Sequence, residues 1–320
     1  MIESEFLRRA LSDLSSVWQQ GNADTLATLS VPDSFLGRRS GLLKGDINQQ
    51  WARWFVESVV DPRRVYEEGI QYPFLFEEVR DAIVERFGPP EKTQPEIQAL
   101  AQIVARIAFS IANSMSSARA RTNLDYIRRK MLLGISGSPP RCWICGAEFQ
   151  EGAIESFLTR APAKLSLPPF VDFLKPRGLS DRDLRIEVDH VVPFSKGGGD
   201  EENLELACGW CNRHKSAYLS IYDVEGQPRT AKSNTLSIHT LPQPFWIVRL
   251  LALRRNCEHP QGCAHSVENA ELTIVTTRTG GAINPANLRV TCYEHDPLRL
   301  KRLQVPSVVR GMWGLDVKEG

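Results

Sequence analysis

Several features that this sequence lacks narrow its class. No stretch approaches the roughly 18 consecutive apolar residues of a membrane-spanning helix, so we expect none. The start, Met1 to Ala10, is charged and amphipathic, unlike the apolar core of a secretory signal. The net charge is only +1, which argues against a protein whose whole surface binds nucleic acid. We therefore expect a soluble, cytoplasmic protein in which any nucleic-acid contact depends on a local site.

Cysteine is absent before Cys142, and seven cysteines follow. Four of them form two Cys-x-x-Cys pairs, Cys142 with Cys145 and Cys208 with Cys211. Disulfides are rare in the cytosol, and an odd number of cysteines cannot all be paired, so the close pairs favour metal. Two such pairs complete the tetrahedral shell of four thiolates that Zn²⁺ prefers in closed, structural sites. Free buried cysteines or a redox pair are the alternatives.

The chain divides by composition into three regions, and the predicted fold class is α+β. Residues 1–135 have helical periodicity, clearest over 3–20, 47–60, 74–87 and a long segment from 94 to about 133. We expect a helical domain there that binds a partner or the substrate. Residues 136–220 are short segments with glycine, proline and cysteine, and carry an insertion at about 150–185. Residues 221–320 form a C-terminal region with the remaining cysteines.

The segment between the two cysteine pairs carries an ordered set of motifs. It reads Asp189-His190-Val-Val-Pro, a triple-glycine turn at 197–199, Asn203-Leu204, and then Cys211-Asn212-Arg-His-Lys215. This order resembles the HNH endonucleases, which are ββα-metal nucleases with flanking zinc knuckles. The resemblance covers residues 141–217, about a quarter of the chain. It implies a treble-clef-like, zinc-bound fold and phosphodiester hydrolysis that leaves a 5′-phosphate and a 3′-hydroxyl.

The residue types suit that chemistry. Histidine changes charge near neutral pH, so His190 can accept a proton from the attacking water. Asp189 offers a hard oxygen to Mg²⁺ or Mn²⁺, which neutralises charge on the scissile phosphate. The resemblance implies that Asn212 is the second ligand, through its side-chain carbonyl, and that Asn203 braces the loop. Because successive strand residues face opposite ways, either the strand is bent at Asp189 or His190 approaches the water from the other side.

Charged residues around this motif are candidate phosphate contacts. Lys196, Arg213, His214 and Lys215 are the candidates, and Lys215 matches the family's lysine. For Lys196 and Arg213, a solvated surface charge is an equal alternative. Glu187 shares the strand face of Asp189, and we favour a surface carboxylate there over a role at the metal.

A second cluster repeats the outline of the first without the Asp-His pair. Cys257, Cys263, Cys292 and His295 are the expected ligands, with His259 and His265 as alternates and simple burial of the cysteines as the other reading. We predict a second, non-catalytic zinc knuckle that binds DNA, packs against the nuclease or mediates dimerisation. Basic residues near it make a nucleic-acid role plausible: Arg254, Arg255, Arg278, Arg289, Arg299, Lys301 and Arg302.

Together these features predict a Mg²⁺- or Mn²⁺-dependent, zinc-stabilised DNA endonuclease, with restriction or anti-phage defence as its suggested setting. One alternative is a non-catalytic zinc-knuckle protein that binds nucleic acid, and another is an RNA-cleaving or toxin nuclease. The chain has no aromatic-rich RNA-recognition string. One HNH site cuts one strand, so double-strand cleavage would need a homodimer or successive nicks. Either sequence specificity or gating by a protein partner would restrain the activity, and the helical domain is the natural place for either.

Overall fold

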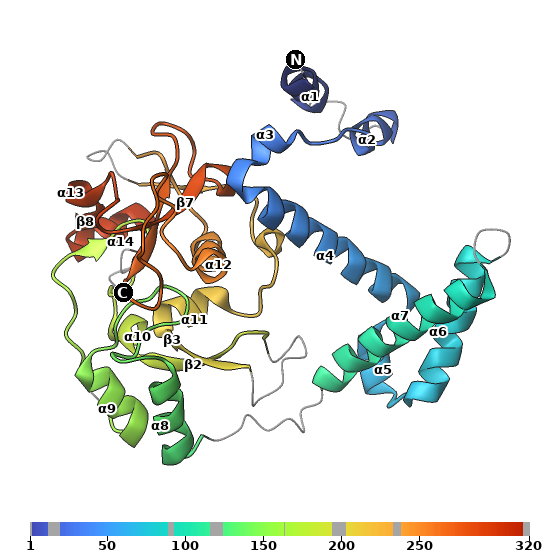
Figure 1. Cartoon of the computed structure of the whole chain (residues 1–320), viewed down its shortest axis with the longest axis horizontal. Coiled ribbons are helices and arrows are strands. Elements are labelled where there is room, and N and C mark those ends of the chain that lie inside the picture. Colours follow the sequence, from blue (N-terminus) through green and yellow to red (C-terminus); the bar gives the residue numbers. More distant parts are fainter. Residues whose placement is uncertain are drawn as a thin grey trace, which may run out of the picture.

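The computed structural model describes residues 2–11, 20–88, 93–115, 124–162, 164–193, 203–232 and 238–315. It has a body that contains the strands and a helical arm, joined by the long helix α4 (Ser40–Val59) (Figure 1). Helices and small antiparallel sheets are mixed, in agreement with the predicted α+β class. Across the described ranges, no helix is both long and apolar enough to cross a membrane.

The arm is a small helical bundle with its own core. Helices α5 (Pro62–Glu67), α6 (Tyr72–Phe87) and α7 (Gln94–Ser114) pack around the far half of α4. Thr93 and Glu96 form a capping box at the start of α7, which satisfies backbone N–H groups of its first turn. Three shorter helices precede α4: α1 (Ile2–Leu11), α2 (Gln20–Ala27) and α3 (Asp33–Leu36). The buried apolar residues of the bundle include Val56, Val65, Leu75, Val79, Ile83, Ile97 and Val104.

The long helical segment expected over 94–133 contains a break. Helix α7 ends at Ser114, and α8 (Tyr126–Ile135) begins anew where the Asp125 side chain accepts a hydrogen bond from the backbone N–H of Arg128 over 2.8 Å. Residues 116–123 lie outside the described ranges. Helix α8 belongs to the body, where it contacts α9 (Glu151–Thr159) and β3 (Leu204–Cys208). A local capping signal thus starts a second helix that the apolar periodicity did not reveal.

The body is built from two-stranded antiparallel sheets, four of them among the described residues. Strand β2 (Ile186–His190) pairs with β3, and β6 (Leu272–Thr276) pairs with β7 (Leu288–Cys292). The two smaller sheets are β1 (Val171–Asp172) with β8 (Leu303–Gln304), and β4 (Arg229–Thr230) with β5 (Thr240–Leu241). The helices around them are α10 (Asp181–Leu184), α11 (Gly209–Lys215), α12 (Pro244–Arg254), α13 (Arg299–Arg302) and α14 (Pro306–Trp313), with short 3₁₀ turns η2 (Gly37–Arg39), η4 (Ile221–Asp223) and η5 (Pro285–Asn287).

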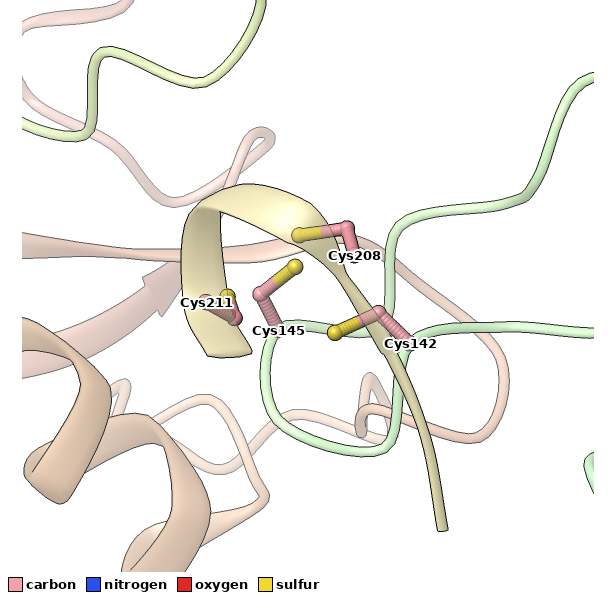
Figure 2. A group of neighbouring side chains, drawn as sticks. All are labelled: Cys142, Cys145, Cys208 and Cys211. Atoms are coloured by element: carbon pink, nitrogen blue, oxygen red, sulfur yellow. The ribbon is translucent and has the colours of Figure 1, made fainter. Parts of the chain in front are cut away.

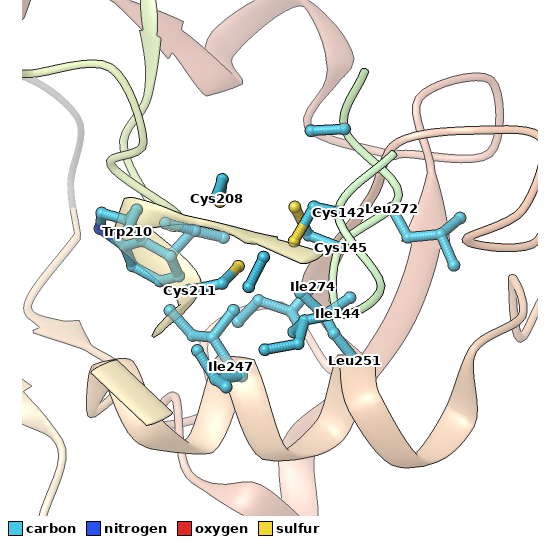
Figure 3. Close-up of a cluster of buried hydrophobic side chains, with 14 of the residues drawn as sticks. Cys142, Ile144, Cys145, Cys208, Trp210, Cys211, Ile247, Leu251, Leu272 and Ile274 are labelled. Carbon is cyan, nitrogen blue, oxygen red and sulfur yellow. The ribbon is translucent and has the colours of Figure 1, made fainter. Parts of the chain in front are cut away.

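The core of the body lies between the two larger sheets. Figure 3 shows Ile247 and Leu251 of α12 facing the first cysteine cluster and Ile274 of β6. The backbone N–H of Leu272 donates to the carbonyl of Cys145 over 2.8 Å, which ties β6 to the first cysteine loop. Gly146 has φ +71, and a Cβ there would lie 2.1 Å from the carbonyl oxygen of Ala270. Only glycine therefore allows this close approach.

Charged residues fix the base of the arm in the body. The Arg39 side chain, only 2% exposed, donates to the carbonyl of Leu288 over 2.8 Å and pairs with Glu258 at 2.5 Å. On α4, the buried Asp46 carboxylate accepts from the backbone N–H of Ile221 at 2.6 Å and from Arg249 at 2.7 Å. Because these charges are buried, each depends on its partner, and the start of α4 is held in one position.

Candidate active site and metal-binding clusters

The four cysteines of the two Cys-x-x-Cys pairs converge on one point. Cys142 and Cys145 lie on one loop, Cys208 ends β3, and Cys211 lies in the first turn of α11 (Figure 2). Their sulfur atoms all lie within 4.8 Å of one another, and all four side chains are buried. Burial raises the pKa of the Cys208 and Cys211 thiols well above their usual value. A bound cation would favour the thiolates, so the set can hold a metal ion in a closed, four-ligand shell.

A buried cation lies next to this cluster. Lys175 donates from Nζ to Glu271 over 2.6 Å and to the carbonyl of Leu272 over 2.9 Å. Burial alone would lower the pKa of Lys175, but the negative charges of Glu271 and of the Cys145 thiolate raise it above its ordinary value. Lys175 is therefore charged, and it offsets part of the negative charge that four thiolates keep after binding a divalent ion.

The second cluster has the four ligands expected from the sequence. One ligand atom each from Cys257, Cys263, Cys292 and His295 lies within 4.8 Å of the others. The alternative ligands His259 and His265 do not belong to this group. The His259 ring instead stacks on the His295 ring, with centroids 3.9 Å apart. This set can also hold a metal ion.

The two clusters are built on the same backbone. In both, the second strand ends on a ligand cysteine that pairs with the first residue of the first strand: Ile186 opposite Cys208, and Leu272 opposite Cys292. In both units, the backbone N–H of the first ligand cysteine donates over 2.9 Å to the carbonyl of the residue two positions after the second ligand cysteine. These bonds join Cys142 to Ala147 and Cys257 to His265. In each unit an asparagine directly before the second strand both accepts from the backbone N–H and donates to the backbone carbonyl of a residue just after the first strand. Asn203 does so with Val192, and Asn287 with Arg278.

This equivalence identifies what the second unit lacks. Counting along the paired strands from the ligand cysteine, Asp189 and His190 correspond to Val275 and Thr276. Neither valine nor threonine offers a carboxylate or an imidazole. The second unit therefore has the cysteine-bearing backbone of the first without its Asp-His pair, as expected from the sequence.

Strand β2 is regular at the Asp-His pair. The pairing with β3 continues without a break through Asp189 opposite Glu205 and His190 opposite Leu204. The bend that the sequence left open is therefore not present, and the two side chains leave opposite faces of the strand. Asp189 is only 4% exposed, whereas His190 is partly exposed.

The Asp189 carboxylate is held from two sides. It accepts a hydrogen bond from the indole N–H of Trp143 over 3.0 Å and pairs with Lys215 Nζ at 2.9 Å. Burial raises the pKa of Asp189, although both contacts act in the opposite direction. Lys215 also donates to the carbonyl of His190 over 2.6 Å. The lysine expected at a phosphate is thus buried here and positions the Asp-His pair.

Glu187 and Asn212 form the second contact of the site. The amide Nδ2 of Asn212, on α11, donates to Glu187 Oε2 over 2.6 Å. A carboxylate only accepts, so this bond fixes the amide orientation and leaves Oδ1 of Asn212 as the atom that could contact a cation. The sequence favoured a surface carboxylate for Glu187, but the structure places it against α11. Gly209 makes this packing possible, since a Cβ there would lie 2.0 Å from the carbonyl of Arg182.

The other predicted phosphate contacts differ in their surroundings. Arg213 pairs with the buried Asp183. The His214 ring stacks on Trp210 with centroids 4.7 Å apart, and burial lowers the pKa of His214 to about 4, so it is neutral at pH 7. Lys196 and the triple glycine at 197–199 lie outside the described residues.

Sequence reasoning missed one side chain of this site. The Trp143 indole reaches Asp189 across 46 residues of chain, and no local pattern announces such a contact. Glu187 had a signal, since it shares a strand face with Asp189, but its partner on α11 could not be inferred from spacing.

One protein-family model matches the part of the chain that carries this site. The model of the HNH endonuclease family matches residues 178–217. This segment is an HNH domain. It contains β2, β3 and α11, and so Asp189, His190, Asn203 and Asn212 all lie inside the HNH match. No curated protein and no solved structure matches the chain.

Proposed function

We propose that this chain is a divalent-metal-dependent endonuclease that hydrolyses phosphodiester bonds in DNA. The contrast between its two cysteine units carries the proposal. Both have the same strand register and a cluster of four possible metal ligands, but only the HNH unit has Asp189 and His190, where the other has Val275 and Thr276. A protein that only bound nucleic acid through zinc knuckles would need neither residue. The second unit shows that the backbone forms without them.

Asp189 and Asn212 are the proposed ligands of Mg²⁺ or Mn²⁺. Both offer hard oxygen atoms, which these ions prefer, and Glu187 holds the Asn212 amide so that Oδ1 is the ligand atom. The Lys215 ammonium at 2.9 Å and the Trp143 indole hold the Asp189 carboxylate in a fixed orientation. Bound there, the ion supplies positive charge to the scissile phosphate and the departing oxygen.

His190 is the proposed general base. It leaves the strand on the face opposite Asp189, so the base and the metal ligands would approach the phosphate from different directions. An imidazole nitrogen of His190 accepts a proton as water attacks phosphorus. The bond to the 3′ oxygen then breaks, which leaves a 5′-phosphate and a 3′-hydroxyl. Asn203 supports the base, since it bonds in both directions to the backbone of Val192 over 2.7 Å.

Both cysteine clusters are proposed to hold structural Zn²⁺. Each has four protein ligands and so no open position for substrate. Zinc in the first cluster fixes β3 and the start of α11, because Cys208 and Cys211 are its ligands. It thereby positions Asn212, the residue that follows Cys211.

The helical N-terminal region, residues 1–135, is proposed to bind a partner or select the substrate, with 136–220 as the nuclease domain and 221–320 as the C-terminal region. We place the protein in the cytoplasm, in restriction or anti-phage defence. Double-strand cleavage would come from a homodimer or from successive nicks.

Digestion of matched substrates tests this function. Supercoiled plasmid, single-stranded DNA and RNA of equal nucleotide concentration are incubated with the protein and Mg²⁺ or Mn²⁺, with and without EDTA. We expect nicked plasmid that disappears with EDTA. Cleavage of RNA alone would support the RNA-directed alternative instead, and binding without cleavage under all conditions would support the non-catalytic one.

A further inference from the structure

A cavity of about 400 Å³ lies beside α11, and Glu187 does not line it. Its walls come from α10, α11, α12, β4 and α14 and from the loop before α10. Its volume is within the range of ordinary small-molecule sites. None of the residues assigned above to catalysis or to zinc lines it.

The charge of the cavity is positive. Three guanidinium groups line it, from Arg213, Arg229 and Arg310, against one carboxylate, Asp183. Arg213 is neutralised by Asp183, and Arg310 donates to the carbonyl of Leu179. Arg229 differs: across the described residues its side chain has no hydrogen bond or ion pair, and its guanidinium lies over the Trp313 ring, 5.2 Å from the centroid.

Aromatic and apolar side chains form the rest of the lining, with Trp210 and His214 from α11 and Trp313 from α14. Trp210 and Trp313 are only 1% and 5% exposed, so the partly exposed His214 ring is the one that a ligand can contact. An unpaired arginine beside aromatic rings suits a ligand that carries both an anionic group and a flat ring. Guanidinium groups bind phosphate oxygens in a fork geometry, and nucleobases stack on aromatic or guanidinium planes with little dependence on the base.

We propose that this cavity binds a nucleoside monophosphate, with its phosphate at Arg229 and its base against the His214 ring. The ligand would contact α11, the helix that also carries Asn212. Arg213 and His214, which line the cavity, directly follow Asn212 in the chain. Binding would therefore restrain the helix that supplies a residue to the HNH site, and the nuclease could respond to free nucleotide.

Isothermal titration calorimetry of the full zinc-bound chain tests the site without any nuclease reaction. The probes are AMP, adenosine and inorganic phosphate. We expect AMP to bind at least about tenfold more tightly than either fragment, because only AMP engages both Arg229 and the His214 ring. AMP binding no tighter than phosphate would leave a simple anion site and overturn the proposal. Absence of AMP binding at millimolar concentration would overturn it as well.

Two variants locate the binding, and one serves as a control. Arg229→Gln should weaken AMP binding about tenfold, and Leu315→Glu, on the rim at 46% exposure, should weaken it by placing a negative charge near the phosphate. Arg80→Gln removes an exposed arginine on α6, outside the cavity, and should leave AMP binding unchanged. Equal AMP affinity in all three variants would contradict the assignment.

Zinc content and circular dichroism confirm that each variant is folded. His190→Ala should bind AMP as the wild type does, which keeps this test separate from that of the nuclease.

Discussion

The Asn212 amide is held by the Glu187 carboxylate over 2.6 Å, across the junction between α11 and β2. This single bond decides which amide atom is the donor, because a carboxylate can only accept. The sequence motif names Asn212 as a ligand but does not say what orients it. The structure supplies the orienting residue.

Glu187 should therefore be a positioning residue. We expect Glu187→Ala to lower the rate of plasmid nicking by roughly 10- to 100-fold, the usual effect of removing a group that orients a metal ligand. Glu187→Gln should retain most of the activity, because a glutamine carbonyl still accepts from Asn212. Nicking rates at a series of Mn²⁺ concentrations measure this, and the alanine variant should need more metal for half-maximal rate.

The glutamine variant separates two roles. If Glu187→Gln loses as much activity as Glu187→Ala, the charge of Glu187 acts on the cation directly, and the orienting role is wrong. Glu155→Gln on α9 is a matched control at a helix-surface position, and its activity should stay at the wild-type level.

Metal content should separate the two clusters. The purified chain should contain about two zinc ions, and Cys292→Ser should contain about one, because each cluster has its own four ligands. Elemental analysis by mass spectrometry measures this. The first unit keeps β2, β3 and α11 around its own cysteines, so Cys292→Ser should still nick plasmid. A variant that retains two zinc ions would show that Cys292 is not a ligand, and one that loses both would show that the clusters do not bind metal independently.

Local patterns were sufficient to predict the parts of the site that lie close together in sequence. The two Cys-x-x-Cys pairs were recognised from their spacing, and the Asp189-His190 pair from the ordered motifs that resemble the HNH endonucleases. The second cluster followed from the same spacing logic, and its four expected ligands do converge.

Contacts between distant segments could not be read in this way. The Trp143 bond to Asp189 and the Arg39 pair with Glu258 join residues far apart in the chain, and depend on how the elements pack. The apolar repeat along α7 does not by itself tell which positions are covered: Ile103 and Ile107 fit the helical period, yet they are exposed. Periodicity marks a helix face, but packing decides whether that face is covered.

A buried ion-pair network should contribute strongly to stability. Asp172 accepts from Arg302 at 3.0 Å and from the Thr273 hydroxyl at 2.7 Å, and Arg302 also pairs with the buried Asp296. Asp172→Asn leaves Arg302 partly unpaired in the interior, so we expect a loss of about 3 kcal/mol in the free energy of unfolding. Urea denaturation measures it. The exposed Asp81→Asn should change stability by less than about 0.5 kcal/mol, and an equally small effect of Asp172→Asn would contradict the buried-network account.

The Asp172–Arg302 pair should also make the stability of the fold depend on pH. Burial raises the pKa of Asp172, but the charges of Arg302 and Lys175 and the hydrogen bonds outweigh it, so the pKa lies below its ordinary value. The stabilisation is then present above the unfolded pKa of about 3.9 and is lost as the pH falls through the lower folded value. The melting temperatures of wild type and Asp172→Asn should differ most near pH 7 and converge below about pH 4. A difference that grows on acidification would have the wrong sign.

Plasmid nicking by His190→Ala tests the central claim most directly. With Mg²⁺ or Mn²⁺, wild type should convert supercoiled plasmid to the nicked form, and His190→Ala should be slower by roughly 10²- to 10⁴-fold while keeping its zinc and its fold. Thr276→Ala, the change at the equivalent position of the second unit, should cleave at the wild-type rate. If His190→Ala cleaves as fast as wild type across both metals, or if neither protein cleaves any DNA or RNA substrate, this chain is not an HNH nuclease that acts through His190.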